Sequence, residues 1–189
     1  MTSNQIIIFA SGSGSNAENI VNYFSNKRSN HKWLICTNNP KARVIERAKK
    51  LQIDYKIFTK DELYNGSILN CINSLNPELI ILAGFLLKFP IEIIDVYNKK
   101  IVNIHPALLP KYGGKGMYGM NVHKAIIKNK EAVSGITIHY VNKKYDEGPI
   151  IFQKKIKINA SYTPNDLANK IHDLEMEYFP KIVENLLTL

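Results

Sequence analysis

The chain has 189 residues, of which 45% are hydrophobic, and its 25 basic and 16 acidic residues give a formal net charge of +9. That length and composition suffice for an α/β core, and we predict one domain over residues 1–189. The charge favours anionic partners, a class that includes nucleic acids, phosphorylated metabolites and polyanionic cofactors. The longest apolar run, residues 79–87, is too short for a membrane span, so no insertion into a membrane is expected.

The two cysteines indicate a reducing compartment. Cys36 and Cys71 are far apart, show no C-x-x-C spacing, and each lies among apolar residues, as buried thiols do. No positively charged leader precedes the first apolar run at Ile6. We therefore predict a protein of the cytoplasm.

Short β-rich runs alternate with helical patterns through the first half of the chain, which is the order of βαβ units. Asn39 is a candidate cap for a helix with Pro40 at its first position, and Thr59 and Glu62 have the spacing of a capping box. Continuously apolar strands suit a parallel sheet that is covered on both faces. The pattern predicts strands at 6–10, 32–37, 55–58, 79–83 and 101–104, and helices from about 16, over 40–51 and over 60–75.

The second half of the chain has a different order. Residues 106–119 are rich in Pro and Gly without periodicity, which predicts a long irregular loop. Thr163 is a candidate cap for a last helix, which Pro180 should kink or split. The predicted class is therefore α/β, with a mostly parallel central sheet, helices on both faces and a late antiparallel hairpin. The elements predicted here are a helix at 121–130, strands at 135–140 and 149–158 around a polar turn at 142–148, and a helix from 164 to about 187.

A Gly/Ser loop, Ser11-Gly12-Ser13-Gly14-Ser15-Asn16, joins the first predicted strand to the first helix. Backbone N–H groups and the helix dipole favour an anion at such a junction, and we predict that a phosphate binds there rather than that the loop is a flexible turn. The same glycines fit the dinucleotide fingerprint. Thr37, Asn38 and Asn39 stand where that motif needs an acidic residue, which argues against a dinucleotide.

Asn103 and His105 lie two residues apart at the end of an apolar strand, so their side chains point to the same face of the sheet. An amide donor and an imidazole that converge on one atom suit acyl transfer if a carboxylate joins them. Asp146, in the predicted hairpin turn, is the candidate carboxylate, but sequence spacing does not show that it meets His105. The plain alternatives are polar groups bonded internally at a strand end and a residue that only closes the turn.

His139, on the strand before that turn, is interpreted as a satisfied core group. The five histidines are scattered without ligand spacing, so we expect no metal.

Four motifs occur in a characteristic order and spacing: Ser11-Gly12-Ser13-Gly14-Ser15-Asn16, Leu82-Ala83-Gly84-Phe85, Asn103-Ile104-His105-Pro106-Ala107-Leu108-Leu109-Pro110-Lys111-Tyr112 and Asp146-Glu147-Gly148-Pro149. In these motifs the chain resembles the phosphoribosylglycinamide formyltransferase family over almost its whole length. The resemblance implies a Rossmann-like formyltransferase fold. It also implies transfer of a formyl group from 10-formyltetrahydrofolate to the glycyl amine of glycinamide ribonucleotide, a step of purine synthesis. The expected partners are these two small molecules, without a metal, nucleic acid or membrane.

The resemblance implies roles for the residues that match it. Asn103, His105 and Asp146 match the catalytic trio. Asn103 and protonated His105 would stabilise the oxyanion, and Asp146 would raise the pKa of His105 and order a water that relays the proton. The ribonucleotide would be bound by Gly14, Ser15 and Asn16 at its phosphate and, in a weaker match, by Glu175 beside His172 at its ribose. The folate would contact Leu86, Leu87, Lys88, Phe89, Asn103, Asn142, Lys143, Lys144, Tyr145 and Asp146.

Three places depart from the family's pattern. Residues 113–120 form a longer loop than in many members, and we interpret it as a mobile lid. Leu87 stands where many members have arginine, so the contact to the folate's glutamate tail is open, with Lys60 or Lys88 as candidates. His123 either helps the acceptor site or faces the core.

Three other functions are alternatives to transfer of a formyl group to glycinamide ribonucleotide. Methionyl-tRNA formyltransferase shares the Asn-x-His and Leu-Leu-Pro elements but carries a further C-terminal domain, for which 189 residues leave no room. Formyltetrahydrofolate deformylase, a hydrolase, carries an added N-terminal domain. A basic module that binds nucleic acid would show steeply salt-dependent binding. The sequence has no stripe of alternating aromatic and basic residues that would favour this function.

Overall fold

The computed structural model describes residues 4–188 and is built on one seven-stranded sheet. The strand order is β3-β2-β1-β4-β5-β6-β7. The first five strands along the chain pair in parallel, whereas β6 is antiparallel to both β5 and β7, so the predicted late hairpin is present. The strands are β1 (Gln5–Phe9), β2 (Lys32–Thr37), β3 (Asp54–Ile57), β4 (Leu79–Leu82), β5 (Ile101–His105), β6 (Val133–Tyr140) and β7 (Ile150–Lys157).

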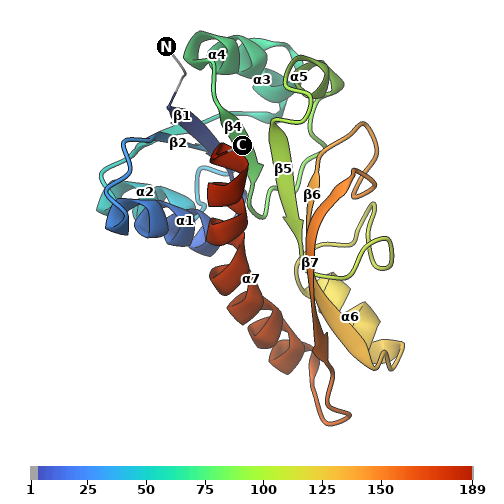
Figure 1. The fold of residues 1–189 in the computed structure, drawn as a ribbon. Helices are drawn as coiled ribbons and strands as arrows, with labels where there is room; N and C mark the ends of the chain where they lie inside the picture. Colours follow the sequence, from blue (N-terminus) through green and yellow to red (C-terminus); the bar gives the residue numbers. More distant parts are fainter. Residues whose placement is uncertain (1–3, 189) are drawn as a thin grey trace.

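Helices cover both faces of the sheet because successive side chains of a strand point to opposite faces. Ile6 and Ile8 of β1 pack into a core with residues of α1, α2, α6 and α7, whereas Ile7 and Phe9 pack into a second core with α3, α4 and α5. Figure 1 shows α1 and α7 side by side in front of the sheet, where they contact each other. The α/β class predicted from the sequence is confirmed. The helices are α1 (Ser15–Asn26), α2 (Val44–Lys50), α3 (Lys60–Tyr64), α4 (Ser67–Leu75), α5 (Ile91–Val96), α6 (Met120–Lys128) and α7 (Pro164–Leu187).

Helix α2 begins later than predicted. Its cap is Arg43 and its first residue is Val44, so the prediction that Asn39 caps a helix starting at Pro40 was wrong. The Asn39 side chain instead accepts a hydrogen bond from the backbone N–H of Lys41, at 2.9 Å. A short polar side chain that closes a turn on its own backbone competes with helix formation, which explains the shift.

The helix predicted over 60–75 is two helices, α3 and α4. Gly66, between them, has φ 92°, a left-handed conformation that interrupts the helix and that glycine adopts without strain. The predicted capping box is confirmed: Thr59 Oγ1 accepts from the Glu62 N–H, and the Glu62 carboxylate accepts from the Thr59 N–H. The six-residue helix α5 was not predicted, because so short a segment carries no measurable period.

Helix α7 starts at the predicted cap, where Thr163 and Asp166 form a second capping box. The prediction was that Pro180 kinks or splits the helix; the helix is continuous through the buried Pro180, so it is not split. Its axis changes direction partway along (Figure 1), as expected where a proline removes one backbone hydrogen bond.

Both cysteines, Cys36 and Cys71, are free thiols, and burial raises the pKa of Cys36. Within residues 4–188, every helix is too short or too polar to cross a membrane.

Candidate active site

A cavity of about 610 Å³ lies at the carboxyl ends of β1, β4 and β5, the edge where open α/β sheets bind ligands. The loops that follow these strands line it, together with the 113–120 segment, α6 and α7. A smaller pocket of about 70 Å³ adjoins it and shares Phe85, Asn103, Tyr145 and Asp146 with it. The two spaces therefore adjoin, and Asn103 and Asp146 line both of them.

The Gly/Ser loop forms one end of the larger cavity, which Gly14, Ser15 and Asn16 line. Gly14 caps α1 with φ 72°, and a Cβ on it would lie 2.3 Å from Cγ2 of Val44 at the start of α2. Only glycine fits this close approach and this backbone conformation. The first N–H groups of α1 have no partner within the helix, so they are available to an anion in the cavity.

A carboxylate lies beside this loop. Glu175 of α7 accepts a hydrogen bond from Asn16 Nδ2 at 2.8 Å, and His172 Nδ1 lies 3.6 Å from the same carboxylate. The Glu175 carboxylate, as acceptor for the His172 ring N–H, raises the pKa of His172. All three side chains line the cavity, although α7 and the loop are about 160 positions apart in the sequence. The cluster offers both acceptors and donors to a ligand with hydroxyl groups.

Asn103, His105 and Asp146 come together where β5 ends, and all three line the cavity. Asn103 and His105 lie on β5, and Asp146 returns to them from the turn between β6 and β7 with φ 54°. His105 Nδ1 is 3.6 Å from Asp146 Oδ2, a pairing that spacing in the sequence could not show. Asp146 Oδ2 also accepts a hydrogen bond from the backbone N–H of Gly114, at 2.8 Å. The 113–120 loop is thus tied directly to the trio.

The protonation of His105 is set by opposing effects. Its Nε2 donates to the Tyr112 carbonyl at 2.7 Å, so Nδ1 is the nitrogen that faces Asp146. Burial lowers the pKa of His105, the Asp146 carboxylate and the Tyr112 carbonyl raise it, and the net pKa is below the ordinary value. Asp146 raises the pKa of His105, as predicted, but desolvation outweighs this effect and the net pKa is lowered.

Asp146 itself is ionised. Burial opposes the charge, but the neighbouring His139 and His105 rings and the Gly114 N–H together hold the pKa of Asp146 below its ordinary value.

His139 is a buried group with both ring nitrogens hydrogen-bonded, as predicted, and it also lines the smaller pocket. It is opposite Asn103 in the antiparallel pairing of β5 with β6. Its Nδ1 donates to the Tyr140 carbonyl at 2.9 Å, which leaves Nε2 to accept from Asn103 Nδ2 at 3.1 Å, and Asp146 Oδ1 is 3.7 Å away. His139 therefore orients the Asn103 amide. Only the β5–β6 register reveals this, and the sequence carried no sign of it.

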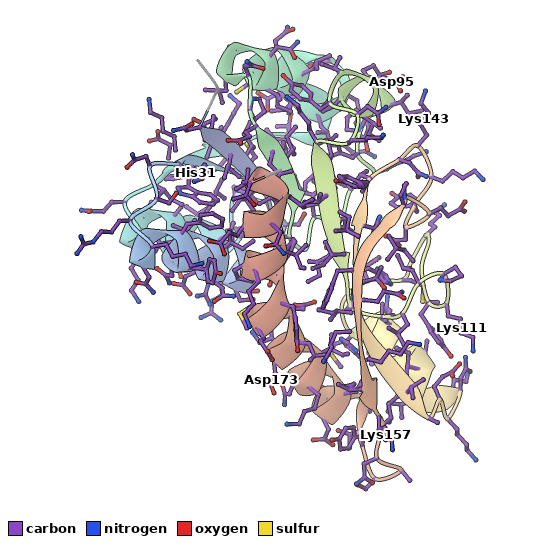
Figure 2. The ribbon with its side chains drawn as sticks, in the orientation of Figure 1. His31, Asp95, Lys111, Lys143, Lys157 and Asp173 are labelled. Atoms are coloured by element: carbon purple, nitrogen blue, oxygen red, sulfur yellow. The ribbon has the colours of Figure 1, made fainter. Side chains whose placement is uncertain are left out.

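The predicted folate contacts divide between the two spaces. Leu86 lines the larger cavity, and the smaller pocket is lined by Leu87, Lys88, Phe89, Asn142, Lys144 and Tyr145. Lys143 lines neither: its ammonium group lies 2.9 Å from Asp95 of α5 on the outside of the molecule (Figure 2). The side chain of Lys143 is thus directed away from both spaces, and the predicted contact of its backbone with the folate stays a prediction. No group of three or more His, Cys, Asp or Glu side chains within the described chain could hold a metal.

The buried histidines predict an acid-sensitive fold. His105 and His123 are 3% and 5% exposed, and burial lowers the pKa of each below the ordinary 6.5. At a pH between the folded and ordinary values, the unfolded chain binds protons that the folded protein does not. The contribution of the neutral His105 and His123 rings to the stability of the fold is therefore complete above pH 6.5. It is lost as pH falls through the pKa values of these rings in the folded protein. The raised pKa of His172 acts in the opposite direction, but its side chain is 47% exposed and its effect is screened.

We expect the melting temperature to fall as pH decreases from 7.5 to 5.5, and to fall less in His123→Gln. Differential scanning calorimetry at fixed ionic strength measures both slopes. A melting temperature that is constant over this range would contradict the assignment of neutral buried rings.

Comparison with known proteins agrees with this geometry. The family model described as "Formyl transferase" matches residues 4–183. The phosphoribosylglycinamide formyltransferase of Bacillus subtilis is 35% identical over 96% of this chain and 94% of its own length. The chloroplastic enzyme of Arabidopsis thaliana is 34% identical over 95% of this chain, which spans 64% of that relative's length. The crystal structure of the phosphoribosylglycinamide formyltransferase from Bacillus halodurans has 31% identity, covers 97% of this chain and 95% of that one, and superposes with a TM-score of 0.87.

The fold and the site therefore define a formyl transferase. Within that class, the match over nearly the full length of the B. subtilis protein is decisive. The chain belongs to the phosphoribosylglycinamide formyltransferase family, as its motifs predicted.

Proposed function

We propose that this protein transfers the formyl group of 10-formyltetrahydrofolate to the glycyl amine of glycinamide ribonucleotide, in purine synthesis. One observation carries the proposal: two adjoining spaces are both lined by Asn103 and Asp146, with His105 beside them. Group transfer between two bound molecules needs such a meeting point, because the reacting atoms must approach to about 3–3.5 Å. A site for a single ligand needs only one of these spaces.

The larger cavity suits the ribonucleotide. Its phosphate binds the N–H groups of residues 14–16 at the start of α1, where the helix dipole favours a dianion. The Glu175 carboxylate accepts hydrogen bonds from the ribose hydroxyls, with His172 beside it. The amine then lies at the far end, near Asn103 and His105. The net charge of +9 also favours the approach of this anion.

The smaller pocket suits the pteridine of the folate. Leu87 and Phe89 supply apolar walls, and the turn around Asn142 and Tyr145 supplies backbone donors and acceptors. The pocket of about 70 Å³ is smaller than a pteridine ring, so the folate displaces side chains as it enters. Tyr145, which lines this pocket and is 39% exposed, is the side chain that moves to make room. Lys88 and Lys144 at its rim are available to the glutamate tail.

In the reaction, the amine attacks the formyl carbon directly. A C–N bond forms, the formyl oxygen becomes an oxyanion, and collapse of this intermediate breaks the bond from carbon to the folate nitrogen. The Asn103 N–H and the protonated His105 ring stabilise the oxyanion. Burial keeps the pKa of His105 low, but the growing oxyanion and the Asp146 carboxylate both favour the imidazolium. Asp146 also orders a water that takes the proton from the amine and delivers it to the departing nitrogen.

The 113–120 segment covers this chemistry. Gly114, Met117 and Met120 line the cavity, and the Gly114 N–H bonds Asp146. We propose that the segment acts as a lid that opens for the ribonucleotide. We further propose that residues 1–189 act as one formyltransferase domain and work in the cytoplasm, where the two free thiols stay reduced.

An absorbance assay tests the function. Deformylation of 10-formyltetrahydrofolate is followed with and without glycinamide ribonucleotide. We expect turnover that depends on the ribonucleotide and yields one formylated product for each folate released. Turnover at the same rate without it would identify a hydrolase, and no turnover in either case would refute the proposal.

A further inference from the structure

His123 lies in the larger cavity and has no role in the chemistry described above. It projects from α6, is 5% exposed, and lines the cavity together with Glu175 and His105. Within residues 4–188, neither ring nitrogen makes a hydrogen bond, and Nδ1 is fully enclosed. An imidazole without a partner is rare in a protein interior, because burying a polar atom without a hydrogen bond costs about 1–3 kcal/mol. The enclosed Nδ1 cannot gain a partner from the cavity, but a ligand there can bond Nε2 and so give the ring one.

Electrostatics locate the ring along the cavity. After burial, the largest influences on the pKa of His123 are the Glu175 carboxylate, which raises it, and the His105 ring, which lowers it. Both groups are thus near enough to act on His123. Glu175 marks the ribose end of the proposed ribonucleotide, and His105 marks the amine end. His123 therefore lies alongside the part of the ligand that connects the ribose to the amine.

The ring presents a donor to this space. Burial keeps the pKa of His123 below its ordinary value, so the ring is neutral at neutral pH and carries one proton. An enclosed lone pair without a partner is tolerated better than an enclosed N–H, which assigns the proton to Nε2. Because Nδ1 is the enclosed nitrogen, Nε2 is the one that reaches the cavity. The complementary ligand atom is a hydrogen-bond acceptor.

We propose that His123 is a substrate-binding residue whose Nε2–H donates to the carbonyl oxygen of the glycinamide linker. In glycinamide ribonucleotide, the group between the ribose and the reacting amine is a single amide, and its oxygen is the strong acceptor there. The proposal rests on the function proposed above. It adds that the enzyme recognises the linker as well as the phosphate and ribose, and so distinguishes the acceptor from other phosphoribosyl compounds.

Three variants separate this role from a role in packing. His123→Gln retains an N–H donor at the position of Nε2, whereas His123→Asn is too short to reach it and His123→Phe keeps the ring without a donor. Isothermal titration measures the Kd of each variant for glycinamide ribonucleotide and for ribose 5-phosphate, which lacks the linker. Lys124→Gln, an exposed change on the same helix, is the matched control. Calorimetric unfolding reports whether each variant is folded.

For His123→Asn and His123→Phe, we expect the Kd for the ribonucleotide to rise about tenfold, as for loss of one buried hydrogen bond. We expect His123→Gln to stay within about threefold of the parent, and ribose 5-phosphate to bind all variants equally. Unchanged ribonucleotide binding in the Asn and Phe variants would overturn the proposal, as would equal weakening of both ligands, which indicates a role in shaping the cavity. If the parent binds the ribonucleotide but transfers no formyl group, the proposed function fails and this test still decides the contact.

Discussion

Replacing Asp146 by asparagine is expected to lower kcat for formyl transfer by about 10²–10⁴ while leaving the Kd for the ribonucleotide within about threefold. The asparagine keeps the shape of the side chain and still accepts from the Gly114 N–H, so the lid contact survives. It removes the charge that opposes the desolvation of His105 at 3.6 Å. The pKa of His105 then falls further, and the imidazolium that faces the oxyanion becomes harder to form.

Single-turnover kinetics separate the chemical step from binding, and titration calorimetry measures the ribonucleotide Kd. Glu147→Gln is the matched control, because this neighbouring carboxylate is exposed and pairs only with Lys144 among the described residues. The control is expected to retain the parent rate. Equal losses in kcat and in ribonucleotide affinity would show that Asp146 binds the substrate rather than acting in the chemical step.

Replacing Asn103 by leucine is expected to lower kcat by about 10²–10³, the usual effect of removing one oxyanion donor. Leucine has a similar size but presents no N–H to the developing oxygen. It also leaves His139 Nε2 without the donor that it faces at 3.1 Å. Because His105 and Asp146 are untouched, the pH at which activity is half-maximal should stay where it is in the parent.

A pH–rate profile of Asn103→Leu checks this, beside Asn185→Leu, an exposed change on α7, as the control. The comparison with Asp146→Asn is informative, because only the aspartate variant should shift the profile to lower pH. A loss of less than about threefold in kcat would remove Asn103 from the proposed oxyanion site.

The local features of the fold were readable from the sequence. The all-apolar runs of β1 and β4, the capping boxes at Thr59 and Thr163, and the Pro/Gly-rich loop after β5 were all predicted. Each depends on contacts between residues a few positions apart, and such contacts leave a periodic or positional signature. The start of α2, the break at Gly66 and the short α5 were missed, because turns and tertiary packing outweigh weak helix propensities over so few residues.

Some features of the candidate site could likewise be predicted from the sequence, and others could not. Asn103 and His105 stood out because they end an apolar strand two positions apart, and the Gly/Ser loop stood out by its place before a helix. That Asp146 lies within 3.6 Å of His105, that His139 orients the Asn103 amide, and that Lys143 points away toward Asp95 could not be predicted. These facts depend on the register of β5 with β6 and on the left-handed turn at Asp146.

The sequence by itself therefore determined the α/β class, the family and the residues capable of the chemistry, because periodicity and motif spacing are local properties of the chain. Only the tertiary structure decided which side chains meet and in which protonation state. The pKa of His105 is the clearest case. The charge of Asp146 could be read from the sequence, but the desolvation that outweighs it arises only when the folded chain buries the ring.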